Sequence, residues 1–78
     1  MKIIKALFGR SDVDTKKVKV GSTTNYQIVS KKDPRKGASV VEHKDGSLNV
    51  VDRSGTEHYD GYSSRSAIET IFAILGLD

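Results

Sequence analysis

Residues 38–61 read ASVVEHKDGSLNVVDRSGTEHYDG, and this stretch places two turn signals between three segments rich in valine and other strand-forming residues. Asp45-Gly46 predicts a two-residue type I′ hairpin turn, because both central residues of that turn need positive φ angles. Arg53-Ser54-Gly55 predicts the next turn, with Gly55 in the left-handed conformation. The sequence therefore predicts three consecutive antiparallel strands, at residues 38–44, 47–52 and 56–60.

The predicted turns also assign side chains to faces of the sheet. With a two-residue turn at Asp45-Gly46, Lys44 pairs with Ser47 and every pair further along the hairpin is fixed. The face expected to be buried carries Val41, His43, Leu48 and Val50, and the later turn adds His58. The opposite face carries Glu42, Lys44, Ser47 and Asn49.

The motif EHKDG at residues 42–46 recurs as EHYDG at 57–61, which raises the question of a shared metal ion. The two histidines would lie two strands apart, about 10 Å laterally, and about 7 Å out of step along the strands. Zinc needs each nitrogen within about 2 Å, so the repeat is interpreted as turn chemistry used twice, without a metal. The chain has no cysteine and no serine in a catalytic motif, so the sequence predicts neither an enzyme nor a cofactor.

The segments before this stretch predict a second hairpin and a basic loop. Lysine alternates with valine in residues 16–20, residues 25–31 alternate again, and a glycine-containing turn lies between them. Residues 12–15 are polar and are expected to form a loop. KKDPRKG at residues 31–37 is expected to be a second loop, because Pro34 removes a backbone donor and disfavours helix.

Helices are expected at both ends of the chain. Ile68, Ile71, Phe72 and Leu75 recur at helical spacing, with Gly76 where a C-terminal glycine cap belongs. The candidates for the N-cap are Ser63, Ser64 and Ser66. Residues 2–9 place their apolar side chains on one arc and predict a short amphipathic helix.

These elements predict a single small α+β domain spanning residues 1–78. Its antiparallel sheet has about five strands, with the C-terminal helix packed on one face and the short N-terminal helix added. No apolar run approaches the roughly 20 residues of a membrane span, and the absence of cysteine suits a reducing cytoplasm.

Charge is distributed unevenly along the chain, whose net charge is +3. Seven basic residues lie between Lys16 and Gly37, where Asp33 is the one acid. The outer side of the first hairpin is expected to display Lys17, Lys19, Gln27 and Lys31, while Tyr26 lies on the valine side and packs in the core. Clustered cations of this kind bind phosphates, so the predicted phosphate contacts are Lys17, Lys19, Lys31, Lys32, Arg35 and Lys36. Lysines that protect a solvated edge strand are the alternative interpretation.

Residues 45–75 are similar to the AP2-like, arm-type DNA-binding domain of phage integrases. A strand, a turn ending in glycine, a strand and an aromatic-x-Ser-Arg step into a helix carry the resemblance, at Gly46, Val50, Gly55, Tyr62, Ser64, Arg65 and Ala67. In that family the sheet docks in the major groove of DNA and the helix packs behind it. Glu42 and Glu57 share the corresponding face here, so the resemblance implies DNA contacts from Lys44, Asn49 and Arg53.

Two classes of function remain open. The first is a non-enzymatic nucleic-acid-binding module. The second is a protein-interaction module, such as a phage or mobile-element inhibitor that occupies an acidic surface on a host protein.

The C-terminal helix is more apolar than one sheet face requires. Either the N-terminal helix covers the excess, or two copies form a homodimer through Ile71, Ile74 and Leu77.

Overall fold

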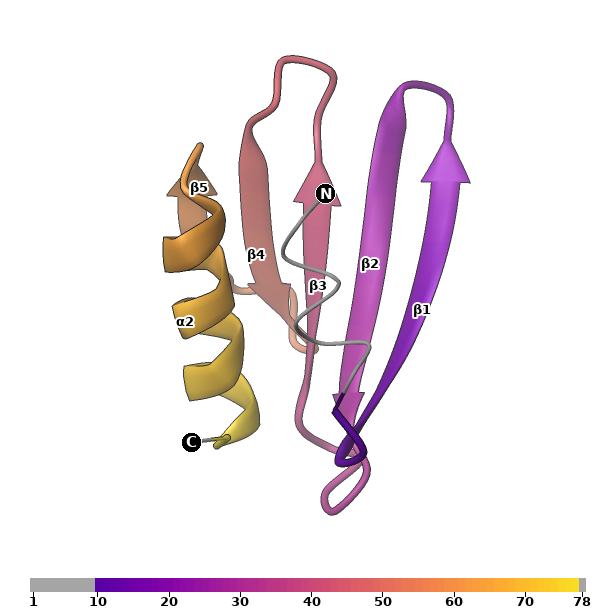
Figure 1. Cartoon of the computed structure of the whole chain (residues 1–78), viewed down its shortest axis with the longest axis vertical. Helices are drawn as coiled ribbons and strands as arrows, with labels where there is room; N and C mark the ends of the chain where they lie inside the picture. The colour runs from indigo at the N-terminus through magenta and orange to yellow at the C-terminus, as the bar shows by residue number, and fades with distance from the viewer. Residues whose placement is uncertain (1–9, 78) are drawn as a thin grey trace.

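The computed structural model describes residues 10–77, which form one five-stranded antiparallel sheet followed by a helix (Figure 1). The strands are β1 (Val13–Val20), β2 (Thr23–Ser30), β3 (Gly37–Glu42), β4 (Leu48–Asp52) and β5 (Glu57–Gly61), and the helix is α2 (Ser64–Leu75). Each strand pairs with the next one in the chain, so β1 and β5 are the two edges. The predicted α+β fold is confirmed, while the helix predicted at residues 2–9 lies outside the described residues.

The sheet has one face covered by α2, which packs across β3, β4 and β5 (Figure 1). We call this side the helix face and the opposite side the outer face. Within residues 10–77, no helix or strand packs on the outer face. The core therefore lies between α2 and the helix face, and its buried side chains are Val13, Tyr26, Ile28, Ala38, Val40, Leu48, Val50, Ala67, Ile71 and Leu75.

Strand β1 begins earlier than the sequence predicts, so the loop expected at residues 12–15 is wrong. Val13 pairs with Ser30 and is only 5% exposed. The backbone N–H of Lys31 also donates to the carbonyl of Asp12 at 3.0 Å, which extends the pairing by one residue. Polar residues fit here because β1 is an edge strand, where their side chains stay in water.

The two C-terminal hairpins share one kind of turn, which has three residues and ends in a left-handed glycine. Gly46 has a φ of 89° and donates to the carbonyl of His43, and Gly55 has a φ of 90° and donates to that of Asp52. The two-residue type I′ turn predicted at Asp45-Gly46 is wrong, because no described residue other than glycine has a positive φ. The Asp45 carboxylate instead accepts hydrogen bonds from Ser47 N and Oγ, a common arrangement in turns.

This extra turn residue shifts the register of β3 and β4 by one residue, and such a shift exchanges the faces of one strand. Val40 pairs with Val50, and Glu42 pairs with Leu48. Leu48 and Val50 are buried on the helix face as predicted. Val41 lies on the outer face and Glu42 on the helix face, both contrary to prediction.

The histidines are not core residues, contrary to prediction. His43 follows the end of β3 and is exposed. His58 occupies an irregularity between β4 and β5, where Tyr59 rather than His58 pairs with Val50.

Helix α2 is capped at both ends. Ser63 is the N-cap among the three serines considered, and its Oγ accepts from Ser66 N at 3.1 Å. Gly76 has a φ of 70°, and Leu77 N donates to the carbonyl of Phe72 at 2.9 Å, so the predicted glycine cap is confirmed.

Candidate nucleic-acid interface

The loop between β2 and β3 (residues 31–36) brings four of the predicted cations to one end of the molecule. It closes through a hydrogen bond from Lys36 N to the Asp33 carbonyl at 2.8 Å and another from Ser30 N to the Lys36 carbonyl at 3.0 Å. Ser30 is buried, and its Oγ accepts from Asp33 N. The sequence therefore folds this segment as a closed turn that holds its basic side chains outward.

Arg35 is partly neutralised within the loop. Its Nε donates to Asp33 Oδ1 at 3.0 Å and its Nη2 to Asp33 Oδ2 at 3.3 Å. This hydrogen bonding lowers the pKa of Asp33 and raises the pKa of Arg35. The Arg35 side chain is nevertheless 91% exposed, so it can exchange this internal partner for a phosphate.

Lys32 and Lys36 lie beside the C-terminal end of α2. They line a hollow of about 300 Å³ together with Arg10, Asp12 and residues 75–77. A side chain at Gly76 would meet the Lys36 ammonium, which places this charge where helix carbonyls end and a cation is favourable. Within residues 10–77, neither lysine takes part in an ion pair.

Arg10 also lies at this end of the molecule, although it was not among the predicted phosphate contacts. It forms a two-point ion pair with Asp12, at 2.9 and 2.8 Å, and its guanidinium lies 5.1 Å from the centre of the Phe72 ring. The hydrogen bond with Arg10 also lowers the pKa of Asp12. The expectation of a loop at residues 12–15 gave no reason to place Arg10 beside α2.

The lysines of β1 lie on the side opposite to the predicted one. Lys17 pairs with Tyr26 and Lys19 with Thr24, so both lie on the helix face, while Gln27 pairs with Lys16 on the outer face. Lys17 Nζ is 6.0 Å from the centre of the Tyr26 ring. Tyr26 is buried as predicted, although not on the side of the valines.

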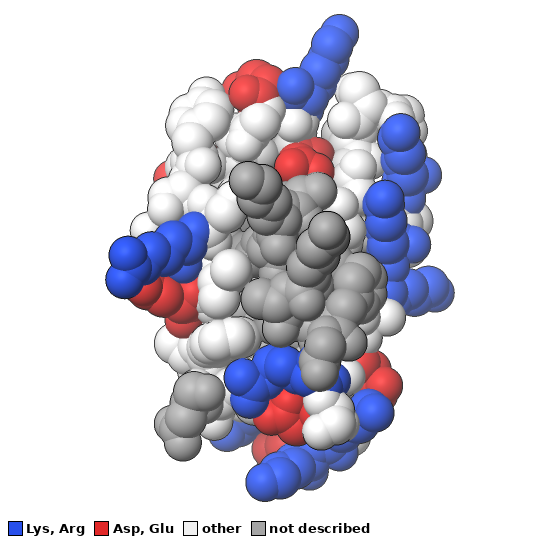
Figure 2. Space-filling view, viewed as in Figure 1, with Lys and Arg blue, Asp and Glu red and all other residues white. Residues whose placement is uncertain are grey.

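The position of α2 explains how Lys17 and Lys19 can lie on the helix face without being buried. The helix packs on β3, β4 and β5 and leaves β1 at the free edge, so Lys17 and Lys19 stay exposed on the helix face. Lys31 is exposed too, with its Nζ 3.8 Å from Asp14 Oδ1. In Figure 2 the basic side chains run down β1 and gather at the end formed by the β2–β3 loop.

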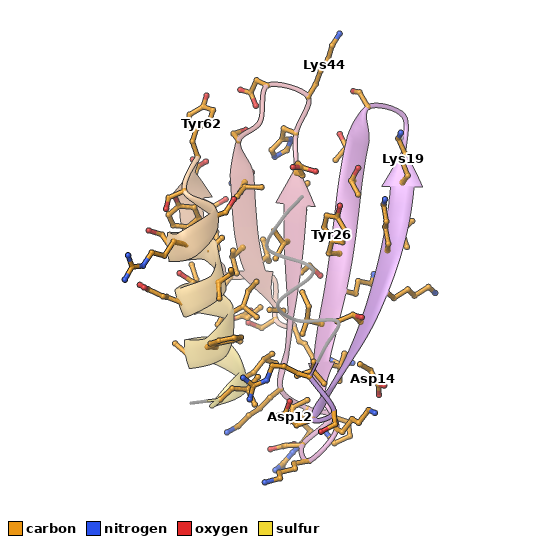
Figure 3. All side chains as sticks on the ribbon, in the orientation of Figure 1. Asp12, Asp14, Lys19, Tyr26, Lys44 and Tyr62 are labelled. Atoms are coloured by element: carbon orange, nitrogen blue, oxygen red, sulfur yellow. The ribbon has the colours of Figure 1, made fainter. Side chains whose placement is uncertain are left out.

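The residues implied by the integrase resemblance do not form one cluster. Lys44 lies in the β3–β4 turn at the end of the molecule opposite to Asp12, as Figure 3 shows. Asn49 is on the outer face, where His43 Nε2 lies 2.5 Å from its Oδ1 and its Nδ2 donates to Glu57 Oε2 at 2.9 Å.

Arg53, unlike Lys44, lies at the end of the molecule formed by the β2–β3 loop. Its side chain crosses Gly37, where an added Cβ would lie 2.9 Å from the Arg53 Cδ, and its Nη1 donates to the carbonyl of Pro34. Gly37 is thus the sequence signal for this placement, because only a residue without a side chain lets Arg53 lie flat there.

The two histidines have separate partners and do not approach a common ion. His58 Nε2 lies 2.7 Å from Asp52 Oδ2 in the β4–β5 turn, whereas His43 contacts Asn49. Among residues 10–77, no group of three or more acidic or histidine side chains is placed to hold a metal.

The three residues predicted for a helix-mediated dimer differ in burial. Ile71 is fully buried in the core of its own chain, so it is not open to a second copy. Ile74 and Leu77 are half-buried against that core. A dimer through these two residues stays a prediction.

The comparisons with known proteins identify no relative. No family model, curated protein or solved structure matches the chain. Within residues 10–77, no helix has both the length and the apolar character to cross a membrane.

Proposed function

We propose that this chain is a non-enzymatic module that binds nucleic acid through the helix-face lysines of β1 and the β2–β3 loop. The observation that carries the proposal is the position of Lys17, Lys19, Lys32 and Lys36, which are all exposed and which form no ion pairs among residues 10–77. Such cations neutralise phosphates and release counterions on binding.

The dimensions of the molecule support a duplex ligand. The longest extent is 33 Å, which is about the rise of ten base pairs. Among residues 10–77, no exposed tyrosine lies near these lysines to stack unpaired bases, because Tyr26 is buried and the exposed Tyr62 lies at the far end, where its hydroxyl donates to Asp45. Contacts to phosphates are the main interaction in this proposal, so we expect weak dependence on base sequence.

A matched pair of double variants tests the proposal. Lys32→Gln with Lys36→Gln removes two charges from the loop end, and Lys44→Gln with Arg65→Gln removes two charges elsewhere. Binding to a 20-base-pair duplex is measured by fluorescence anisotropy at several salt concentrations. We expect the loop variant to lose about tenfold in affinity at low salt and to reduce the slope of log K against log salt by about 1.8 units.

The control variant should keep nearly all the affinity of the unmodified chain. Equal losses in both double variants would contradict a localised interface. A loss confined to the control would move the contact to the β3–β4 turn or to α2. Circular dichroism checks that each variant is folded.

One observation favours a protein partner as the second candidate. Strand β1 is a regular eight-residue edge strand on which no further strand of residues 10–77 pairs, and an extended acidic segment could pair with it beside Lys17 and Lys19. Capture from a lysate with and without nuclease separates the two candidates. A partner that is retained after nuclease treatment would support the protein-interaction function.

A further inference from the structure

The outer face of the sheet carries apolar side chains that no described element covers. Val18, Val29, Val41 and Val51 are half-buried there, and Val20 at the end of β1 is 70% exposed. Covering these β-branched side chains would remove apolar surface from water, which is favourable at about 25 cal/mol per Å².

Charges on this face are balanced in number, and Lys31 and Asp14 already form an ion pair within the chain. The acids are Asp14, Glu57 and Asp60, and the bases are Lys16, Lys31 and Arg53. A face with equal numbers of both signs attracts a polyanion poorly, so the outer face suits a protein surface better than a nucleic acid.

The strand register places two opposite charges at the two ends of one row of paired residues across the sheet. Lys16 in β1 pairs with Gln27, which pairs with Ser39, then Val51 and finally Glu57 in β5. One row across the outer face thus begins with a cation and ends with an anion. Asp60 lies on the same edge as Glu57, one row away, because it pairs with Asn49.

We propose that two copies of this chain pack outer face against outer face, about a twofold axis running along β3. This rotation places β1 of one copy over β5 of the other. Lys16 of each copy then lies opposite Glu57 of the second copy and diagonal to Asp60. Val41 and Ser39 meet their own counterparts at the axis, as a twofold interface requires.

The other twofold arrangement gives no charge pairs. An axis across the strands would place β1 over β1 and bring Lys16 against Val18 of the second copy. The charge pattern therefore selects the axis along the strands, with the two sheets aligned as in a sandwich.

The size of the face sets the expected affinity. Five strands about 4.8 Å apart and about 20 Å long give a face of roughly 500 Å². Two such faces bury about 1,000 Å², the lower end for a specific interface. We therefore expect a weak dimer, with a Kd on the order of 10–100 µM.

The lysines of the proposed nucleic-acid site remain exposed in this dimer. Lys17 and Lys19 lie on the helix face, and Lys32 and Lys36 lie at the loop end. Asn49, in contrast, lies on the outer face and is covered by the second copy. The dimer therefore excludes the integrase-like mode, in which the sheet face contacts DNA, but it leaves the proposed function intact.

Charge exchange between the edges tests the arrangement. Lys16→Glu alone places two anions together at both ends of the interface, and Glu57→Lys alone places two cations together. We expect each variant to weaken the dimer about tenfold. An equal mixture of the two variants pairs opposite charges at both ends, so mixing should restore dimerisation to the level of the unmodified chain.

Sedimentation equilibrium from about 5 to 500 µM measures these outcomes, with one copy at 8.5 kDa. Lys19→Glu is the control, since it makes the same charge change in β1 on the helix face, and it should dimerise normally. Asp60→Lys is a second variant on the β5 edge, in case loss of the Asn49–Glu57 hydrogen bond unfolds the Glu57→Lys variant.

Several results would overturn the proposal. A monomer at every concentration would exclude the dimer altogether. Dimerisation that is unchanged in both single variants, or that is not restored by mixing them, would place the interface elsewhere, for example on Ile74 and Leu77 of α2.

Discussion

The helix face and the outer face of the same sheet have different roles, although valine is abundant on both. On the helix face, Val40 and Val50 are 0% exposed beneath α2. On the outer face, the neighbouring residues Val41 and Val51 are half-buried, and no described element covers them. Strand geometry alternates these positions, so adjacent residues belong to different surfaces: the buried core on the helix face, and on the outer face the surface that we propose for association.

The basic residues show the same division. Lys17 and Lys19 share the helix face with the core but lie beyond the reach of α2, whereas Lys16, the residue directly before Lys17, lies on the outer face. A lysine in β1 therefore belongs to one of two surfaces according to whether its number is odd or even. Composition alone would count all three as one basic patch.

The largest effect on stability is expected from truncating one valine on the helix face, compared with truncating the adjacent valine on the outer face. Val50→Ala should lower the free energy of unfolding by about 2 kcal/mol, because it leaves a cavity beneath α2. Val51→Ala should cost less than about 1 kcal/mol, because its side chain already contacts water. Urea denaturation at a few micromolar protein, where the proposed dimer is dissociated, compares the two. Equal losses would show that the outer face is covered within one chain.

The sequence predicted the elements of this fold better than their faces. The glycine turns, the five strands and the capped C-terminal helix each follow from local residue patterns. The face of the sheet on which each side chain lies depends on whether the turn has two or three residues, and Asp45-Gly46 is compatible with both lengths. The turn has three residues and is stabilised by hydrogen bonds from Ser47 to the Asp45 carboxylate. Hydrophobic periodicity does not predict this contact.

The candidate site was predictable in composition but not in arrangement. KKDPRKG predicted a basic loop because Pro34 interrupts the strand pattern, and the structure has such a loop. The orientation of Lys17 and Lys19 was predicted wrongly, since alternating lysine and valine usually places valine toward the core. At this edge the register with β2 aligns Lys17 with buried Tyr26 instead, and Val18 is left on the outer face.

A smaller effect is expected on the outer face at Gly37. Gly37→Ala would place a Cβ 2.9 Å from the Arg53 Cδ and 3.2 Å from the Ile28 carbonyl oxygen, so the arginine must move off Pro34. We expect a loss of about 1 kcal/mol in the free energy of unfolding. In an Arg53→Ala background the same substitution should cost less, because the obstructing side chain is gone. Urea denaturation of both single variants and the double variant measures the coupling, and strictly additive losses would contradict this packing.

The smallest effect is expected at Asp52, on the helix face at the edge of the core, and it should appear as a change in pH dependence. The Asp52 carboxylate accepts hydrogen bonds from Ser54 Oγ at 2.6 Å, Ser54 N at 2.9 Å and Thr56 N at 3.0 Å, and it lies 2.7 Å from His58 Nε2. These hydrogen bonds, led by the one from Ser54 Oγ, hold the pKa of Asp52 far below its usual value of 3.8.

A pKa that is lower in the folded than in the unfolded chain stabilises the fold at pH values above the unfolded pKa. That stabilisation declines as the pH falls from about 4 toward the folded pKa. Asp52→Asn should therefore lower stability at pH 7 and reduce the further loss between pH 4 and pH 2. Ser54→Ala keeps the charge but removes the leading hydrogen bond, so its acid dependence should lie between those of the unmodified chain and Asp52→Asn. Urea midpoints measured from pH 7 to pH 2 test this order, and an unchanged acid dependence in Asp52→Asn would show that this turn contributes nothing to it.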